Sequence, residues 1–316
     1  MKSELKNKFT LRLRSSSDKW IDSGFKNLSV AMAATVAIVL FSILLVVFLQ
    51  SKASIQNYGL NFLITSEWDP INNRYGAFTA IYGTVITSLV SLLIAIPLGI
   101  GTAILLTEQI LPRQITEIIG LMVELLAAIP SVVLGLWAVF VMEPFIRPLL
   151  NYIHIHFGWL PLFSTEAVGP GLAPAILILV VMILPIITAI SRDSLEQVPN
   201  RLREAAYGIG ATRWCSLFNV ILPAAISGIT GGILLALGRA IGETMAVTMI
   251  IGNSNNFSWS LFAPGYTISA LLANQFGEAD GSQISSLMYA AFILMIMTLI
   301  INIFAQWLVK KLSLKY

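Results

Sequence analysis

Charged side chains are scarce in this chain. Only 11% of its 316 residues are Asp, Glu, Lys or Arg, and 57% are hydrophobic. An ordinary soluble domain has about 25% charged residues, so this composition excludes a soluble globular protein and indicates an integral membrane protein. The apolar stretches also lack the period-two alternation of barrel strands, which leaves helices as the only structures that can span the membrane.

Several chemical signatures are missing as well. A single cysteine, Cys215, excludes an intramolecular disulfide. No G-x-x-x-x-G-K-[ST] sequence occurs, so we expect this chain not to bind ATP itself. His154 and His156 have no third metal ligand nearby in the sequence, and the apolar segments contain no nucleophile–base pair. These absences predict that the chain is not an enzyme and has no cofactor or metal of its own.

What the chain does have is long apolar runs. A helix needs roughly 20 apolar residues to cross the hydrocarbon core. Six windows meet this length and predict an all-α protein with six transmembrane helices: 29–49, 81–107, 118–142, 171–190, 224–251 and 286–309. The basic start of the chain is too long for a secretory signal and no cleavage pattern follows it, so we expect the first helix to be retained.

The Lys and Arg residues predict the orientation of these helices. With both termini in the cytoplasm, fifteen of the nineteen basic residues lie inside, including Arg113 and four in the loop 191–223. Only Lys52, Arg74 and Arg147 lie outside. This asymmetry follows the positive-inside rule, so the charge of +3 reports topology and does not indicate nucleic-acid binding. We therefore expect a cytoplasmic tail over 1–28 and a membrane domain over 29–316.

The inner loop 191–223 is too polar to enter lipid, and its second half reads EAAYGIGATRWCSLFNVILP from Glu204. Pro199 suits a first helical turn, Gly208 and Gly210 permit a left-handed end, and Thr212 can cap a second helix. This predicts a helix, a glycine turn and a second helix at the membrane face. Such a loop could bind a soluble partner, or it could anchor at the lipid headgroups. We expect Leu202, Ala206 and Ile209 to form its bundle-facing side.

The same loop resembles that of the membrane subunits of bacterial ABC-type importers. Their pattern is E-A-A, three residues, G, nine residues, I, one residue and L-P. The chain matches it except that Val220 replaces the isoleucine. In that family the loop is a coupling helix bound in a groove of the ATPase subunit. The resemblance implies a type I importer (MetI-like) permease fold and assigns ATPase contact to Glu204, Ala205, Ala206, Gly210, Leu222 and Pro223.

A narrower resemblance extends from about residue 60 to 253. The run Ala236 to Ala246, ALGRAIGETMA, is similar to the fifth span of phosphate importer permeases, and the N-terminal extension is more similar to their C type than to their A type. This resemblance implies a permease subunit of an ATP-driven phosphate importer in the bacterial inner membrane. It also implies four kinds of partner: a homologous A-type permease, two ATPase subunits that bind ATP and Mg, a phosphate-binding receptor outside the membrane, and the lipid bilayer.

Arg239 is the residue in this run that most needs an explanation. A lone Arg inside a span costs about 2.5–3.5 kcal/mol on insertion scales, so it needs a partner or an aqueous path. Glu243 lies four residues later, where the two side chains would share a helix face. They could form a closed structural ion pair. Alternatively, Arg239 could bind phosphate bidentately while Glu243 orients the guanidinium. We assign Arg239, Glu243 and Thr244 to the substrate pathway.

Other residues and functions are weaker candidates. Glu124 could line a gate or bond to a neighbouring helix, and Pro130-Ser131 could break a helix near the pathway or form an ordinary kink. A permease for sulfate or molybdate is the alternative within the same class. A self-contained ion-coupled carrier would also explain a buried Arg and Glu, but it leaves the E-A-A loop without a role.

Overall fold

A computed structural model describes residues 16–108 and 110–313. Six basic residues that contribute to the predicted topology lie outside this part: Lys2, Lys6, Lys8, Arg12, Arg14 and Lys315.

The described chain is mainly helical. Its elements, in order, are α1 (Ser16–Tyr58), α2 (Asn61–Ile64), β1 (Trp68–Asp69), β2 (Arg74–Tyr75), α3 (Phe78–Thr107), α4 (Arg113–Ala128), α5 (Ser131–Trp137), η2 (Ala138–Met142), α6 (Glu143–Phe157), η3 (Pro161–Phe163), α7 (Leu172–Glu196), α8 (Asn200–Gly208), α9 (Arg213–Ser216), η4 (Leu217–Ile221), α10 (Leu222–Gly242), α11 (Met245–Ile250), α12 (Ile268–Gln275) and α13 (Gly281–Ser313).

Among the described residues, six helical runs are long and apolar enough to cross a membrane, which confirms the predicted number. They are Asp22–Tyr58, Phe78–Thr107, Ser131–Phe157, Leu172–Glu196, Arg213–Gly242 and Gly281–Trp307.

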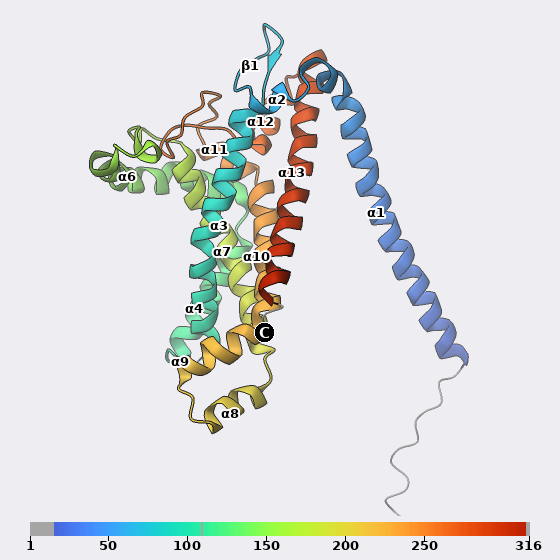
Figure 1. Ribbon diagram of the computed structural model, residues 1–316, viewed down its shortest axis with the longest axis vertical. Coiled ribbons are helices and arrows are strands. Elements are labelled where there is room, and N and C mark those ends of the chain that lie inside the picture. The colour runs from blue at the N-terminus through green and yellow to red at the C-terminus, as the bar shows by residue number, and fades with distance from the viewer. Residues whose placement is uncertain (1–15, 109, 314–316) are drawn as a thin grey trace, which may run out of the picture. The chain divides into compact units, whose positions relative to one another are not determined.

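Helix α7 is the centre of the bundle that begins at Gln50. It is apolar on every side, as expected for a helix surrounded by others, and 61% of its membrane window is buried against 28% for α3. It packs along α3 and α10 (Figure 1). The bundle has two distinct ends: α8 and α9 lie at one, which we call the α8 end, and β1, α2 and α12 lie at the other, the hairpin end (Figure 1). The loop 191–223 therefore lies at the opposite end from the predicted outer loops.

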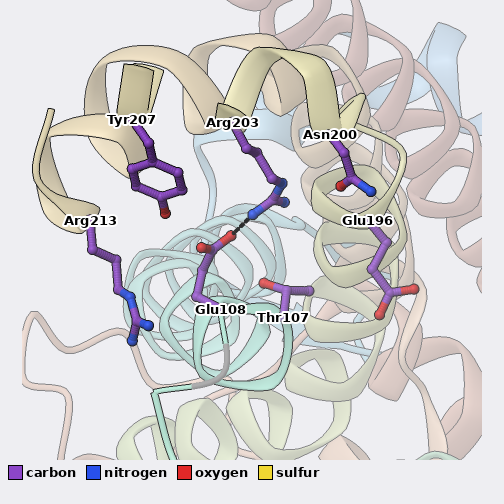
Figure 2. Close-up of a pocket in the computed structure, with 7 residues that line it drawn as sticks. All are labelled: Thr107, Glu108, Glu196, Asn200, Arg203, Tyr207 and Arg213. Atoms are coloured by element: carbon purple, nitrogen blue, oxygen red, sulfur yellow. Dashed lines mark hydrogen bonds and ion pairs between the residues drawn. The ribbon is translucent and has the colours of Figure 1, made fainter. Parts of the chain in front are cut away.

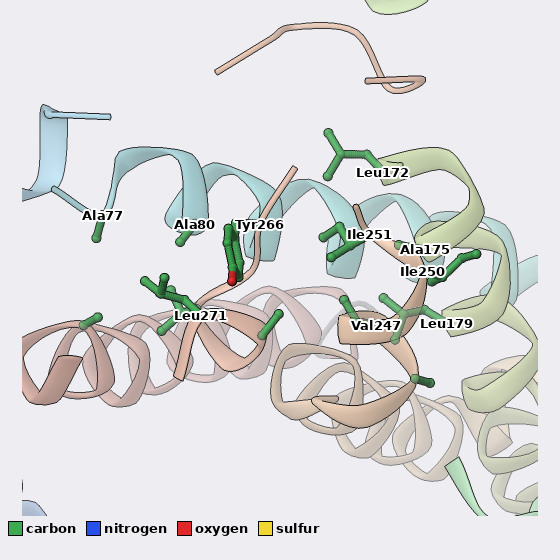
Figure 3. Packing of buried hydrophobic residues seen from close by; sticks show 14 of the residues in the cluster. Ala77, Ala80, Leu172, Ala175, Leu179, Val247, Ile250, Ile251, Tyr266 and Leu271 are labelled. Carbon is green, nitrogen blue, oxygen red and sulfur yellow. The ribbon is translucent and has the colours of Figure 1, made fainter. Parts of the chain in front are cut away.

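The hairpin end is packed around the irregular segment between α11 and α12 (Figure 3). Backbone hydrogen bonds attach this segment to the start of α7, including Ala173 N–H to the Leu261 carbonyl at 2.7 Å. Tyr266 crosses α3 so closely that a Cβ on Gly83 would lie 1.9 Å from the Tyr266 carbonyl oxygen. Since that contact is with backbone, it can be relieved only by moving the chain, and glycine is required at this position.

The β1–β2 hairpin is a two-residue ladder in which Trp68 pairs with Tyr75. Asp69 closes its turn: the Asn72 side chain donates to its Oδ2 at 2.6 Å, and this bond, followed by the Asn72 backbone N–H, lowers the pKa of the Asp69 carboxyl. The turn also holds Asn73 at φ +52°, and its carbonyl accepts a 2.7 Å bond from Tyr58 Oη at the end of α1.

The prediction of one continuous third span over 118–142 was wrong. The helix stops at Ala128 and restarts at Ser131, and Ile129 is extended with ψ 127°. Pro130 explains the break: it has no N–H to donate, its ring clashes with the carbonyl four residues earlier, and it disfavours helical dihedrals at the residue before it. By length and composition, the apolar helical run of this region is Ser131–Phe157, and α4 is a separate helix.

The fifth span, predicted over 224–251, is also broken. Helix α10 ends at Gly242, Glu243 is extended with φ −65° and ψ 123°, and α11 begins at Met245. There is no proline here. The Glu243 carboxylate instead accepts a 3.3 Å bond from the Ala246 N–H, which satisfies one of the free donors at the start of α11.

Two π turns, η2 and η4, each end two residues before a proline. In η2 the Glu143 N–H donates to the Ala138 carbonyl and Pro144 follows; in η4 the Leu222 N–H donates to the Leu217 carbonyl and Pro223 follows. A proline ring clashes with the carbonyl four residues earlier. Widening the preceding turn moves that carbonyl away, so the helix continues past the proline.

Candidate functional site

The predicted helix, glycine turn and helix are present between α7 and α10. Helix α8 ends in a Schellman motif, in which the Ala211 N–H donates to the Ala206 carbonyl at 3.0 Å and the Gly210 N–H to the Tyr207 carbonyl at 2.9 Å. Gly210 is in the left-handed region at φ +86°, whereas Gly208 remains helical. Thr212 caps α9 by accepting a 3.3 Å bond from the Cys215 N–H. The glycine of the E-A-A pattern therefore fixes the angle between α8 and α9.

Gly210 and Gly208 form a matched pair for mutation. A Cβ at either position meets nothing within 4 Å, so only the backbone conformation distinguishes them. We expect Gly210→Ala to cost about 1–2 kcal/mol, because a side chain disfavours the left-handed region. Gly208→Ala should be neutral or stabilising by about 0.5–1 kcal/mol in a helix. Hydrogen exchange of the α8 amides in the purified protein would measure the difference, and equal protection in both variants would contradict this account of the turn.

Helix α8 has one face packed on the bundle and one face exposed. Ala206 is 4% exposed, as predicted for the bundle side, so little of its side chain is available for the ATPase contact that was also predicted for it. Leu202 and Ile209 are 42% and 87% exposed, so their predicted place on the bundle side was wrong. Arg203 occupies that side instead. Glu204 and Ala205 are exposed and lie with Leu202 and Ile209 on the outer surface. An apolar surface of this kind, with one carboxylate, is suited to contact with a protein partner.

Arg203 connects α8 to the C-terminal ends of α3 and α7. Its guanidinium bonds to the carboxylate of Glu108, the C-cap residue of α3 (Figure 2). It also donates at 2.9 Å to the Leu195 carbonyl in the last turn of α7. The Glu108 side chain is only 5% exposed and the Arg203 side chain 19%. A carboxylate at a helix C-terminus is repelled by the helix dipole. Arg203 compensates this repulsion, and we call the two side chains the Arg203–Glu108 latch.

The latch lies in a polar cavity of about 350 Å³ between α8 and the ends of α3 and α7 (Figure 2). Glu196 on its wall is paired at 2.8 Å with Arg192, which compensates its negative charge. Arg213 also lines the cavity. The remaining lining side chains are polar: Thr107, Asn200 and Tyr207. No sequence motif or spacing singles out Glu108 or Arg203 for a role here.

Leu222 and Pro223, predicted to contact the ATPase, are half-buried where η4 meets α10. Pro223 lies in the first turn of α10, directly after the π turn that accommodates it. Their position sets the path from α9 into the fifth span, so the contact predicted for them would be indirect.

Arg239 lies in the last turn of α10, where the negative end of the helix dipole favours a cation. Arg239 is exposed, and its side chain makes no ion pair or hydrogen bond with the described residues. It lines a cavity of about 70 Å³, several times the roughly 10–15 Å³ that one water molecule requires. The other lining residues come from α4, α5, α7 and the break: Leu126, Ala127, Ile129, Leu134, Met182 and Ile186.

The predicted one-turn pairing of Arg239 with Glu243 was wrong, because α10 ends between them. The Glu243 carboxylate accepts from the Ala246 N–H at the start of α11, and the hydroxyl of Thr244, the next residue, donates to the Gly242 carbonyl at 3.1 Å. The closed structural ion pair is therefore not formed. A cation beside a cavity and without an anion of its own is arranged to accept an anionic ligand or a carboxylate from a partner.

The exposed face of α10 consists mostly of small residues. A Cβ on Gly231, Gly238 or Gly242 would meet nothing within 4 Å. The exposed positions recur every three or four residues, as one helical face requires: Ala224, Ser227, Gly231, Leu235, Arg239 and Gly242. This open stripe leads from the α8 end to Arg239.

The predicted gate residues have different surroundings. Pro130 is exposed and ends α4, and Ser131 begins α5 next to the Arg239 cavity, so the break predicted as one alternative is real. Helices α5 and α11 touch closely here, since a Cβ on Gly135 would lie 2.9 Å from the Ala246 Cα. Glu124 is exposed on α4 and makes no hydrogen bond or ion pair with the described residues, which leaves its role as a gate a prediction.

Comparison with known proteins gives a consistent answer. Residues 95–314 match the model of the binding-protein-dependent transport system inner membrane component family. The chain belongs to this family. It is 44% identical over 298 residues to the phosphate transport system permease protein PstC of Mesorhizobium japonicum, covering 92% of this chain and 91% of that protein. It is 42% identical over 306 residues to the protein of the same name from Xylella fastidiosa strain 9a5c, covering 94% and 93%.

Solved structures agree on the fold. A bacterial alginate ABC transporter in complex with a pentasaccharide-bound periplasmic protein matches with a TM-score of 0.64 at 17% identity, covering 93% of this chain and 98% of that one. The MetNI methionine ABC transporter matches with a TM-score of 0.56 at 20% identity, covering 73% and 94%. The predicted MetI-like permease fold and the multi-pass inner-membrane location are confirmed.

Proposed function

We propose that this chain is the permease subunit of an ATP-driven phosphate importer and forms half of the translocation pathway. The observation that carries the proposal is Arg239, a cation without an anionic partner that lines a cavity at a helix break. Relatives at 42–44% identity over most of the chain are named phosphate permeases, which supports phosphate as the cargo. A guanidinium presents a planar fork of donors that fits phosphate bidentately.

We further propose that a homologous A-type permease covers the open stripe of α10. Small residues on a helix let another helix or a substrate come close. Two such stripes facing each other would enclose a path in which Arg239 is the anion-binding group. Glu243 adds negative charge nearby, which disfavours a fully ionised anion and favours a protonated phosphate with hydroxyl donors.

Energy would enter at the α8 end. We assign the exposed surface of α8, with Glu204, Ala205 and Ile209, to a groove in one of two ATPase subunits that bind ATP and Mg. Closure of that pair moves α8, and the latch passes the movement to α3 and α7. Helix α7 reaches both sites, because Leu195 at the latch lies nine residues, or about 14 Å, from Ile186 at the Arg239 cavity. Its movement would open and close the path in alternating access.

This assignment fixes the orientation: the α8 end and both termini face the cytoplasm, and the hairpin end receives the phosphate-loaded receptor. A self-contained carrier would leave the outer surface of α8 unused. A sulfate or molybdate permease is the alternative within the class.

The test is uptake of radioactive phosphate by the complete importer in liposomes, with its receptor present. Excess sulfate should leave uptake unchanged, whereas competition by sulfate at similar concentration would favour the alternative.

A further inference from the structure

Helix α6 differs from the other long helices of the bundle in its direction. It follows the π turn η2 and runs across the bundle axis at the hairpin end, whereas α3, α7, α10 and α13 run along it (Figure 1). Its 15 residues give a length of about 22 Å. It is therefore placed to lie in the plane of a membrane surface.

Most polar side chains of α6 are bonded within the protein. Glu143 is 3% exposed and accepts two bonds from Arg147, at 2.7 and 2.6 Å. Asn151 Oδ1 accepts from the Ala167 N–H at 2.8 Å, and His154 Nδ1 lies 2.7 Å from the Phe163 carbonyl oxygen. Asn151 and His154 thus hold the segment after α6 against the helix, and Glu143 and Arg147 pair with each other within it.

The outward face of α6 is apolar and aromatic. Its exposed large residues, which continue into the following turn, recur at spacings of three and four: Phe145 at 84%, Leu149 at 60%, Tyr152 at 58%, Ile155 at 76% and Trp159 at 77%. The exposed positions from 144 to 159 include no Lys, Arg, Asp or Glu, and their titratable residues are Tyr152 and His156. The Arg147 side chain, 43% exposed, is the charged group nearest this face, and it is paired with Glu143. A helix in water has the opposite arrangement, with polar residues outside and apolar residues within.

We infer that α6 is an interfacial helix whose outward face is buried in the lipid of the membrane surface at the hairpin end. Aromatic residues are enriched at the level of the headgroups, and Phe145, Tyr152 and Trp159 supply them along the whole helix. The face is continuous with exposed apolar residues of η2, Phe140 at 74% and Val141 at 53%, so one apolar surface extends from the span onto α6. The polar anchoring of its inner side holds the helix at that depth.

The direction of α6 changes at the widened turn before Pro144, where the helix leaves the bundle axis instead of continuing as the third span. The lipid contact is consistent with this change, because it gives the apolar outward face of α6 an apolar environment. With its inner side bonded to the segment after it, α6 would fix the depth of that hairpin-end loop relative to the bilayer. The inference concerns α6 alone and holds for any cargo, so its failure and the failure of phosphate transport are separate results.

Spin-label accessibility in the assembled importer in liposomes tests this inference. Cys215 is the one cysteine of the chain, so Cys215→Ser leaves no other labelling site on this subunit, and the partner subunits are used in cysteine-free form. Nitroxides are then placed by Tyr152→Cys and Ile155→Cys on the outward face, and by Glu166→Cys at an exposed position in the loop after the helix. Two positions on α6 are used so that one failed variant does not decide the matter.

We expect the labels at 152 and 155 to collide with oxygen, which concentrates in lipid, several-fold more than with a water-soluble nickel chelate. The label at 166 should show the reverse ratio. High nickel accessibility at 152 and 155 would place the face in water and overturn the inference. Low accessibility to both reagents, or failure of both positions to label, would mean that a protein partner covers the face, and this would overturn it equally.

Discussion

Replacing Arg239 with Gln is expected to abolish phosphate uptake by the assembled importer. Each hydrogen bond to a charged group contributes about 1.5–3 kcal/mol, and the bidentate contact that we propose contains two. Their loss predicts a fall in uptake of at least about 100-fold, since about 1.4 kcal/mol corresponds to a factor of ten. Initial rates of receptor-dependent uptake into proteoliposomes give the measurement.

The variant should still fold and assemble. Arg239 is exposed and makes no ion pair or hydrogen bond with the described residues, so Gln leaves no buried charge unpaired. Copurification of the partner subunits with Arg239→Gln should match that of the wild type. Arg113→Gln is a matched control, because Arg113 is another exposed arginine, at the start of α4. Normal uptake by Arg239→Gln would remove Arg239 from the pathway, and lost assembly would make its role structural.

Breaking the Arg203–Glu108 latch is expected to uncouple ATP hydrolysis from transport. Arg203→Ala leaves the nearly buried Glu108 carboxylate unpaired at a helix C-terminus, which costs about 1–3 kcal/mol. Helix α8 still presents its exposed surface to the ATPase, but it no longer holds the ends of α3 and α7 firmly. We predict that the ATPase rate persists while phosphate transported per ATP hydrolysed falls several-fold.

Two further variants separate coupling from stability. Arg203→Lys keeps the charge and should recover part of the transport-to-hydrolysis ratio. The exchange of both residues, Arg203→Glu with Glu108→Arg, should recover more than either single change does, because it restores an ion pair and places a cation at the end of α3. Equal losses of ATPase and transport in every variant, tracking the amount of folded protein, would contradict a role in coupling.

The sequence predicts the number of spans and the shape of the loop well, because both depend on local patterns. Long apolar runs are sufficient to identify membrane helices. Gly210 and Thr212 perform the turn and cap expected of them, since these depend on a few neighbouring residues. The break at Pro130 also has a local signal, as do the widened turns that precede Pro144 and Pro223. In these last three cases a proline carries the information.

The features that were missed depend on contacts between distant residues. Glu108 and Arg203 are 95 positions apart, and no periodic pattern connects them. Their only local signals are a carboxylate directly after a span and an arginine beside the buried Ala206. The break after Gly242 has no proline, and Glu243 is stabilised there by capping α11 while α11 packs on Gly135. Helical spacing alone therefore paired Glu243 with Arg239 incorrectly.

The dependence of phosphate uptake on ATP hydrolysis tests the central claim most directly. Liposomes would contain this chain with its homologous permease, in one preparation with the ATPase subunits and in another without them, and the receptor would be added outside. We predict uptake only when the ATPase and hydrolysable ATP are both present inside, and none with a non-hydrolysable analogue. Phosphate entry at the same rate without the ATPase would contradict it and would indicate a self-contained carrier.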